Sequence, residues 1–147
     1  MIEQKPDVLF HHFNSIGNNN YLLYVCKLIE KGFKQKIQPI YIHTNNQQQA
    51  EQLDKLLWTF KQDSFIPHAI VGASDLDSPV QIGWNENQFH PAEAIVNLSE
   101  EIPISYLESK KIHEIIDDDE VKKNKARERW RNYKSEGCQL DFTKSSN

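Results

Sequence analysis

The sequence has few cysteines and no long apolar segment. Only Cys26 and Cys138 occur in its 147 residues, too few for a disulfide framework or a cysteine-rich zinc site. No apolar run reaches the roughly 18 residues that a membrane-spanning helix needs. The N-terminal residues MIEQKPDVLFHHF lack the basic region and long apolar core of a secretion signal. We therefore expect a cytoplasmic protein that does not interact with a membrane.

Glycine is also scarce, which argues against a nucleotide site. The five glycines, at 17, 32, 72, 83 and 137, form neither GxGxxG nor GxxxxGK[ST]. The first expected strand-to-helix loop, residues 11–18, has one glycine and no lysine to hold a pyrophosphate or triphosphate. We therefore expect no nucleotide cofactor.

Catalytic and metal-binding patterns are missing as well. No pair of the six histidines, at 11, 12, 43, 68, 90 and 113, has the HExxH spacing that places two imidazoles on one helical face. His68 follows a proline and is expected to bond neighbouring backbone. Asp75 and Asp77 lie in a polar loop, where solvation explains them. The sequence predicts no catalytic site, no metal site and no cofactor.

The remaining composition is that of a globular protein. Hydrophobic residues make up 38% and charged residues 26%, and the formal net charge is -4. A chain of this length can bury a core without disulfides or metal. We expect one domain over residues 1–147, in which about 140–147 form a C-terminal tail.

Apolar patterning predicts alternating strands and helices. Strands are expected at 8–13, 37–43, 67–71, 80–84, 94–98 and, as a weak last candidate, 112–116. Of these, 80–84 alternates as an antiparallel or edge strand does. Helices are expected around 22–33, ended by Gly32, around 50–57, capped by Thr44 or Asn45, and within 103–111 and 122–134. This order predicts an α/β fold with a parallel sheet covered on both faces.

The middle of the chain, residues 53–68, carries two aromatic residues outside the apolar stripe. Leu57 belongs to that stripe, and Trp58 lies about 100° round the helix from it. Because Pro67 ends any helix before it, Trp58 and Phe65 flank one connection. The two rings either anchor a partner protein or cap the core beneath the loop.

Basic residues near the C-terminus are arranged along a helix. Residues 122–134 hold seven basic residues against one acid, Glu128, and Asp118 or Asp119 can cap the helix. Helical spacing puts five side chains on one face over three turns: Lys123, Arg127, Trp130, Arg131 and Lys134. An adjoining stripe of Ala126, Trp130 and Tyr133 would rest the helix on the sheet.

This face suits a ligand that is both acidic and apolar. Arg127 and Arg131 can bind carboxylates, and Trp130 can contact an apolar side chain. An acidic peptide ending in an aromatic residue matches, and so does single-stranded nucleic acid. The negative net charge argues against nucleic acid. A solvated helix without a partner is the third alternative.

Five short segments together resemble a known family. They are LDKLLW at 53–58, SFIPH at 64–68, SPVQIGW at 78–84, AIVNLS at 94–99 and ARERWRNYK at 126–134. In this order they resemble the chi subunit of bacterial DNA polymerase III holoenzyme, an accessory subunit of the clamp loader. The resemblance implies a Rossmann-like three-layer α/β sandwich with a mostly parallel central sheet, helices on both faces and no nucleotide-binding loop.

The resemblance also implies a non-catalytic subunit with two partners in DNA replication. One is the psi subunit of the clamp loader, and the other is the acidic C-terminal tail of single-stranded DNA-binding protein. The implied tail site is Lys123, Arg127, Trp130 and Arg131, and the implied psi site is Trp58 and Phe65. Tyrosine often stands at position 130 in the family and lysine at 131, and residues 85–93 match less well. The alternatives are a direct single-stranded nucleic-acid-binding module and an adaptor that offers the same surfaces to a repair helicase.

Overall fold

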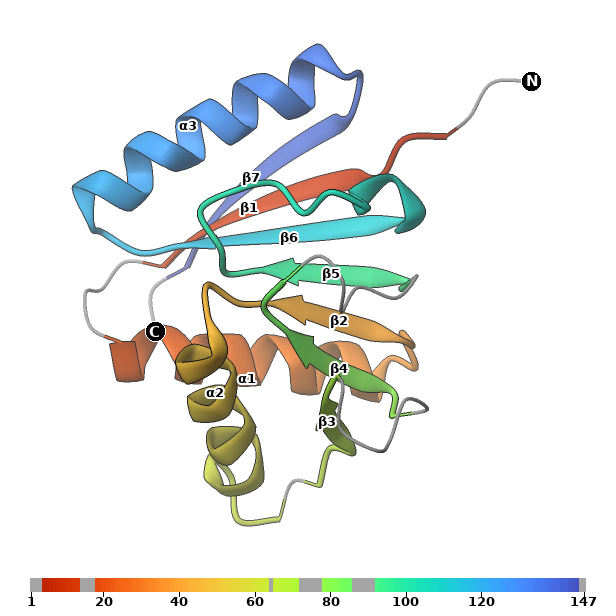
Figure 1. Ribbon diagram of the computed structural model, residues 1–147, viewed down its shortest axis with the longest axis vertical. Helices are drawn as coiled ribbons and strands as arrows, with labels where there is room; N and C mark the ends of the chain where they lie inside the picture. Colours follow the sequence, from red (N-terminus) through yellow and green to blue (C-terminus); the bar gives the residue numbers. More distant parts are fainter. Residues whose placement is uncertain (1–3, 14–17, 64, 72–77, 86–91, 146–147) are drawn as a thin grey trace.

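The computed structural model describes residues 4–13, 18–63, 65–71, 78–85 and 92–145. Within these residues a seven-stranded sheet has the order β3-β4-β2-β5-β6-β1-β7 (Figure 1). All of its strand pairings are parallel. The strands are β1 Asp7–Phe13, β2 Ile40–His43, β3 His68–Ile70, β4 Val80–Gly83, β5 Ala94–Asn97, β6 Lys111–Ile116 and β7 Gln139–Ser145.

Helices cover both faces of this sheet. α1 (Asn18–Lys34) and α2 (Gln47–Thr59) pack on one face, and α3 (Glu120–Ser135) packs on the other (Figure 1). The apolar core is correspondingly divided into one cluster on the α1 and α2 side and a second on the α3 side. The α/β sandwich with a parallel sheet predicted from the sequence is therefore confirmed. Within the described ranges, no helix combines the length and apolar character needed to cross a bilayer.

Two helix boundaries differ from the sequence prediction for local reasons. α1 continues past Gly32 to Lys34, and a side chain at Gly32 would lie 3.2 Å from Ile40 Cδ1, so glycine lets the helix approach β2. The N-cap of α2 is Asn46, whose side chain accepts a hydrogen bond from the Gln49 amide. Thr44 and Asn45 precede this N-cap position, and the Thr44 hydroxyl instead donates to the Gly83 carbonyl.

The prediction of an antiparallel or edge position for β4 is wrong. β4 is parallel and lies between β3 and β2, with all four residues buried. Gln81 causes the apparent alternation because it is polar, yet its amide is buried and donates to the Ser78 carbonyl. A polar residue in a strand therefore does not mark a solvent face when its hydrogen bonds are satisfied.

The C-terminal segment contains a strand that the sequence pattern does not predict. Residues from about 140, expected to form a tail, lie mostly in β7, which pairs with β1 from Asp7 opposite Gln139 to Phe13 opposite Ser145. Gly137, at φ 89°, turns the chain out of α3. β7 is therefore the last strand of the chain, and its pairing makes β1 an interior strand, while β6 lies between β5 and β1. Of the expected helix within 103–111, only the 3-10 turn Tyr106–Glu108 forms.

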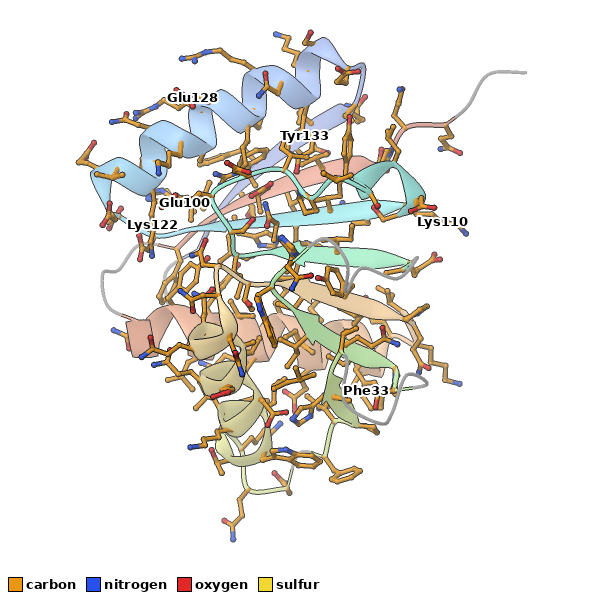
Figure 2. The ribbon with its side chains drawn as sticks, viewed as in Figure 1. Phe33, Glu100, Lys110, Lys122, Glu128 and Tyr133 are labelled. Atoms are coloured by element: carbon orange, nitrogen blue, oxygen red, sulfur yellow. The ribbon has the colours of Figure 1, made fainter. Side chains whose placement is uncertain are left out.

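A buried polar network fixes α3 on the sheet. Glu114, in β6, is fully buried, and its Oε1 accepts from Arg129 Nε at 3.0 Å. Its Oε2 accepts from the Tyr133 hydroxyl at 2.7 Å and from Asn97 Nδ2 at 2.9 Å. Burial raises the pKa of Glu114, while the Arg129 guanidinium and the three hydrogen bonds oppose that rise. Tyr133 points from α3 toward the sheet and Glu128 points away from it (Figure 2).

We expect Arg129→Met to destabilise the protein because it leaves the Glu114 carboxylate buried without its cation. The free energy of unfolding, measured with urea, should fall by about 3–5 kcal/mol. The loss should be smaller at low pH, where the carboxyl becomes protonated, and larger as pH rises. The control is Arg127→Met, an exposed change on the same helix, which should stay within about 0.5 kcal/mol of the unsubstituted protein. Equal stability of the two variants would contradict the anchoring role.

Candidate functional site

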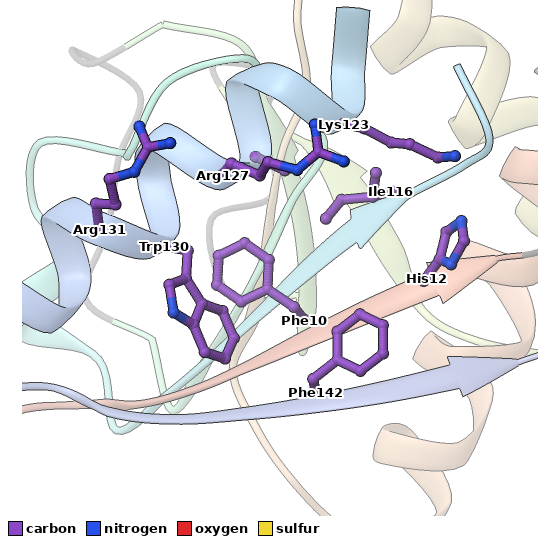
Figure 3. A pocket seen from close by; sticks show the side chains of 9 residues that line it. Phe10, His12, Ile116, Lys123, Arg127, Trp130, Arg131 and Phe142 are labelled. Atoms are coloured by element: carbon purple, nitrogen blue, oxygen red, sulfur yellow. The ribbon is translucent and has the colours of Figure 1, made fainter. Parts of the chain in front are cut away.

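A groove of about 660 Å³ lies between α3 and the strands β1 and β7 (Figure 3). We call it the α3 groove. All four residues of the predicted tail site border it, so the structure brings them together on one surface. Its lining consists of Phe10, His12, Ile116, Lys123, Ala126, Arg127, Trp130, Arg131 and Phe142.

The floor of the α3 groove is apolar and aromatic. The half-buried Trp130 ring meets Phe10 edge to face, with centroids 5.1 Å apart. Phe142, from β7, is 59% exposed and points into the groove from the opposite side (Figure 3). Ile116 and Ala126 complete the apolar surface. Such a floor can bury an apolar or aromatic group of a ligand.

The rim on α3 is a cationic row formed by Lys123, Arg127 and Arg131. Successive members are four residues apart, so the row spans about 12 Å along the helix. The Lys123 ammonium lies 3.5 Å from Glu120 and 3.7 Å from Asp118. Among the described residues, neither Arg127 nor Arg131 is in an ion pair, and the guanidinium of Arg127 donates only to Asn124 on its own helix. Both guanidiniums can therefore receive an anionic ligand.

Sequence reasoning did not assign four of the lining residues to this surface: Phe10, His12, Ile116 and Phe142. The His12 ring lies 2.7 Å from the Asp118 carboxylate. His12 follows Phe10 by two residues on β1, so the side chains of His12 and Phe10 lie on the same face of the sheet. Strand alternation alone could have indicated His12. Phe142 had no such signal because β7 was not predicted. Lys134, assigned to the same helical face, is exposed but does not line the groove.

Trp58 and Phe65 form a second exposed surface, here called the aromatic pair. Trp58 is 48% exposed and Phe65 is 69% exposed, whereas the neighbouring Leu57 is buried. The two ring centroids are 5.5 Å apart, and the Trp58 ring also lies 4.2 Å from the His68 ring. His68 is held by the carbonyls of Ile66 and Asp54, as the sequence predicted for its neighbouring backbone. The exposure of both rings favours an anchoring role over a cap on the core.

His11 and His113 form a hydrogen-bonded pair on the neighbouring strands β1 and β6. His11 Nε2 lies 2.8 Å from His113 Nδ1, and His11 Nδ1 lies 2.9 Å from the Tyr24 hydroxyl. Burial, with Lys111 and Lys31, lowers the pKa of His11 to about 4, and burial, with His11 and Lys111, lowers that of His113 to about 3. The pair is therefore uncharged at neutral pH. Within the described ranges, no group of histidine, cysteine or carboxylate side chains could hold a metal ion. His90, Asp75 and Asp77 lie outside these ranges.

A smaller hollow of about 430 Å³ lies at the carboxyl ends of β2, β4 and β5. The chain after β2 leads to one face of the sheet, and the chain after β5 leads to the other (Figure 1). The crevice between two such strands, at their carboxyl ends, is where α/β folds commonly bind nucleotides. Here the lining includes Glu100 and Glu101, whose carboxylates repel phosphate. The Asn46 side chain also caps the nearby start of α2, where a phosphate would otherwise accept backbone hydrogen bonds. The hollow is therefore poorly suited to nucleotides.

Comparison with known proteins identifies the family of this chain. Residues 6–141 match the family model described as "DNA polymerase III chi subunit, HolC". The DNA polymerase III subunit chi of Pseudomonas aeruginosa is 29% identical over 131 residues, covering 89% of this chain and 91% of that protein. The same subunit of Haemophilus influenzae is 27% identical over 103 residues, covering 69% and 72%. The chain therefore belongs to the family of DNA polymerase III chi subunits, which are accessory and non-catalytic.

Proposed function

We propose that this protein is the bridge between the clamp loader and single-stranded DNA-binding protein during DNA replication. In this proposal the α3 groove binds the acidic C-terminal tail of the DNA-binding protein, and the aromatic pair binds the psi subunit. The observation that carries it is an aromatic floor bordered by a row of cations, a surface that includes all four residues predicted for the tail site. The protein acts in the cytoplasm as one domain.

The α3 groove matches the chemistry of such a tail. Family resemblance implies a run of aspartates, then apolar residues and a terminal phenylalanine. A terminal phenyl ring would lie against Trp130 and Phe142. The terminal carboxylate and the aspartates would pair with Arg127 and Arg131, which have no ion-pair partner among the described residues. Apolar burial and charge pairing would thus act on the same short peptide.

The aromatic pair has the properties of an interface anchor. Large exposed aromatic rings contribute much of the binding energy in protein interfaces. Trp58 is held by its contacts with Phe65 and His68, so it loses little side-chain freedom when a partner binds. The pair lies beside β3 at one edge of the sheet, whereas the α3 groove lies beside β7 at the other. Two partners can therefore bind simultaneously.

An adaptor for a repair helicase would use the same two surfaces, so it is an alternative partner rather than a different site. A direct nucleic-acid-binding module would need phosphate contacts over a larger basic surface. In this chain the basic residues flank an apolar floor, and the net charge is -4. This combination favours an acidic peptide over a nucleic-acid strand.

We expect Arg127→Ala to weaken binding of a fluorescent tail peptide by about tenfold, or ~1.5 kcal/mol, because one charge-assisted contact is lost at a partly solvated site. Affinity for the unsubstituted protein should also fall as salt is added. The matched control is Lys134→Ala, which removes an exposed cation of α3 that does not line the groove. Unchanged affinity in Arg127→Ala would argue against the assigned tail site.

We expect Phe65→Ala to lose the psi subunit in a pull-down but to keep the tail peptide, because the aromatic pair and the α3 groove are separate. Arg127→Ala should show the reverse behaviour. Loss of both partners by Phe65→Ala would indicate unfolding, and circular dichroism of the variant distinguishes that result. Retention of psi by a folded Phe65→Ala variant would refute the proposed psi surface.

We expect bare single-stranded oligonucleotides to bind only weakly compared with the tail peptide, because the cationic row is short and the protein is acidic overall. Fluorescence anisotropy at low salt measures both ligands. Tight oligonucleotide binding with a steep dependence on salt would favour the nucleic-acid module instead.

A further inference from the structure

The outer edge of β7 borders the α3 groove and has no neighbouring strand among the residues that the structure describes. β7 is last in the sheet order and pairs on one side only, with β1. Along Gln139–Ser145, the described residues form no backbone hydrogen bond to any segment beyond the sheet. An edge strand presents alternate N–H and C=O groups outward, and these groups can pair with an added strand.

The edge of β7 carries little of what usually blocks strand addition. Its sequence, QLDFTKS, contains no proline, and its register with β1 runs one to one without a bulge. Because Phe142 lines the α3 groove, alternation places Lys144 on the same sheet face. Charged residues often protect an edge, and β7 carries two: Lys144, on the groove face, attracts an acidic strand, whereas Asp141 lies on the opposite face.

The spacing of the cationic row fits an extended peptide. Lys123, Arg127 and Arg131 recur about every 6 Å along α3. Side chains on one face of an extended chain recur about every 6.8 Å. Alternate carboxylates of an extended acidic peptide can therefore meet successive cations of α3, while its backbone lies along β7.

Backbone polarity favours the same arrangement. A peptide that lies beside Phe142 and directs side chains into the α3 groove loses water from part of its own N–H and C=O groups. An extended peptide has no internal hydrogen bonds to compensate, and the outer edge of β7 offers the missing partners. Strand addition combines main-chain bonds for affinity with alternate side chains for specificity.

We propose that the acidic peptide binds as an additional strand on the outer edge of β7, with alternate side chains directed into the α3 groove. This inference rests on the proposed function for the identity of the peptide. It adds that the protein recognises the peptide backbone as well as its charges and terminal ring.

The test uses the full-length protein and three synthetic tail peptides. One peptide is unmodified, and the other two carry backbone N-methyl groups on complementary alternate residues. In an added strand, only one alternate set of N–H groups faces β7. We expect one methylated peptide to lose about tenfold or more in affinity, because several main-chain hydrogen bonds to β7 are lost. The other should bind like the unmodified peptide.

Equal affinities of the two methylated peptides would overturn strand addition. If the unmodified peptide itself does not bind, the proposed function fails, so the two failures are distinguishable. Amide hydrogen exchange provides the second measurement: the peptide should slow exchange in β7 and leave the opposite edge strand, β3, unchanged. Protection of β7 that rises with protein concentration in the absence of peptide would show that a second copy occupies the edge, which would also overturn the proposal.

Discussion

The buried ion pair between Glu114 and Arg129 determines how α3 presents its side chains. Arg129 is directed into the protein, where its guanidinium bonds both the Glu114 carboxylate and the Glu100 carbonyl. Arg127 and Arg131 stand two residues to either side, about 200° round the helix, so they point away from the sheet. A single inward cation thereby fixes the outward direction of the cationic row. The hydrogen bond from Tyr133 adds a second contact one turn further along.

The C-terminal strand β7 forms the side of the α3 groove opposite α3. Without β7 the α3 groove would have cations and Trp130 but no Phe142 and no strand edge opposite them. The connection from β6 to β7 runs through α3 and passes over β1. It therefore places α3 on one side of the groove and β7, the strand that follows α3, on the other. The affinity for a peptide in this site would therefore depend on a helix and strand that are consecutive in the chain.

The fold places its candidate binding surfaces at the two edges of the sheet rather than at the carboxyl ends of its central strands. The hollow at the ends of β2 and β5 holds Glu100 and Glu101, which are unsuited to phosphate. The aromatic pair lies beside β3, and the α3 groove lies beside β7. Under the proposed function, this separation would let two proteins bind at once, because neither partner would cover the site of the other.

Local patterns in the sequence determined the parallel α/β order, the apolar stripes of the helices and the cationic row with Trp130. These features depend on residues a few positions apart, so helical and strand periodicity reveals them. Only the tertiary structure decided that β4 is interior, that residues after Cys138 form a strand, and that Arg129 is buried while Arg127 is exposed. Each of these features depends on a partner distant in the chain. Gln81 is buried because β4 pairs with β2 and β3. β7 forms by pairing with β1, and Arg129 is buried because it bonds Glu114. Periodicity cannot specify such partners, because it describes one segment at a time.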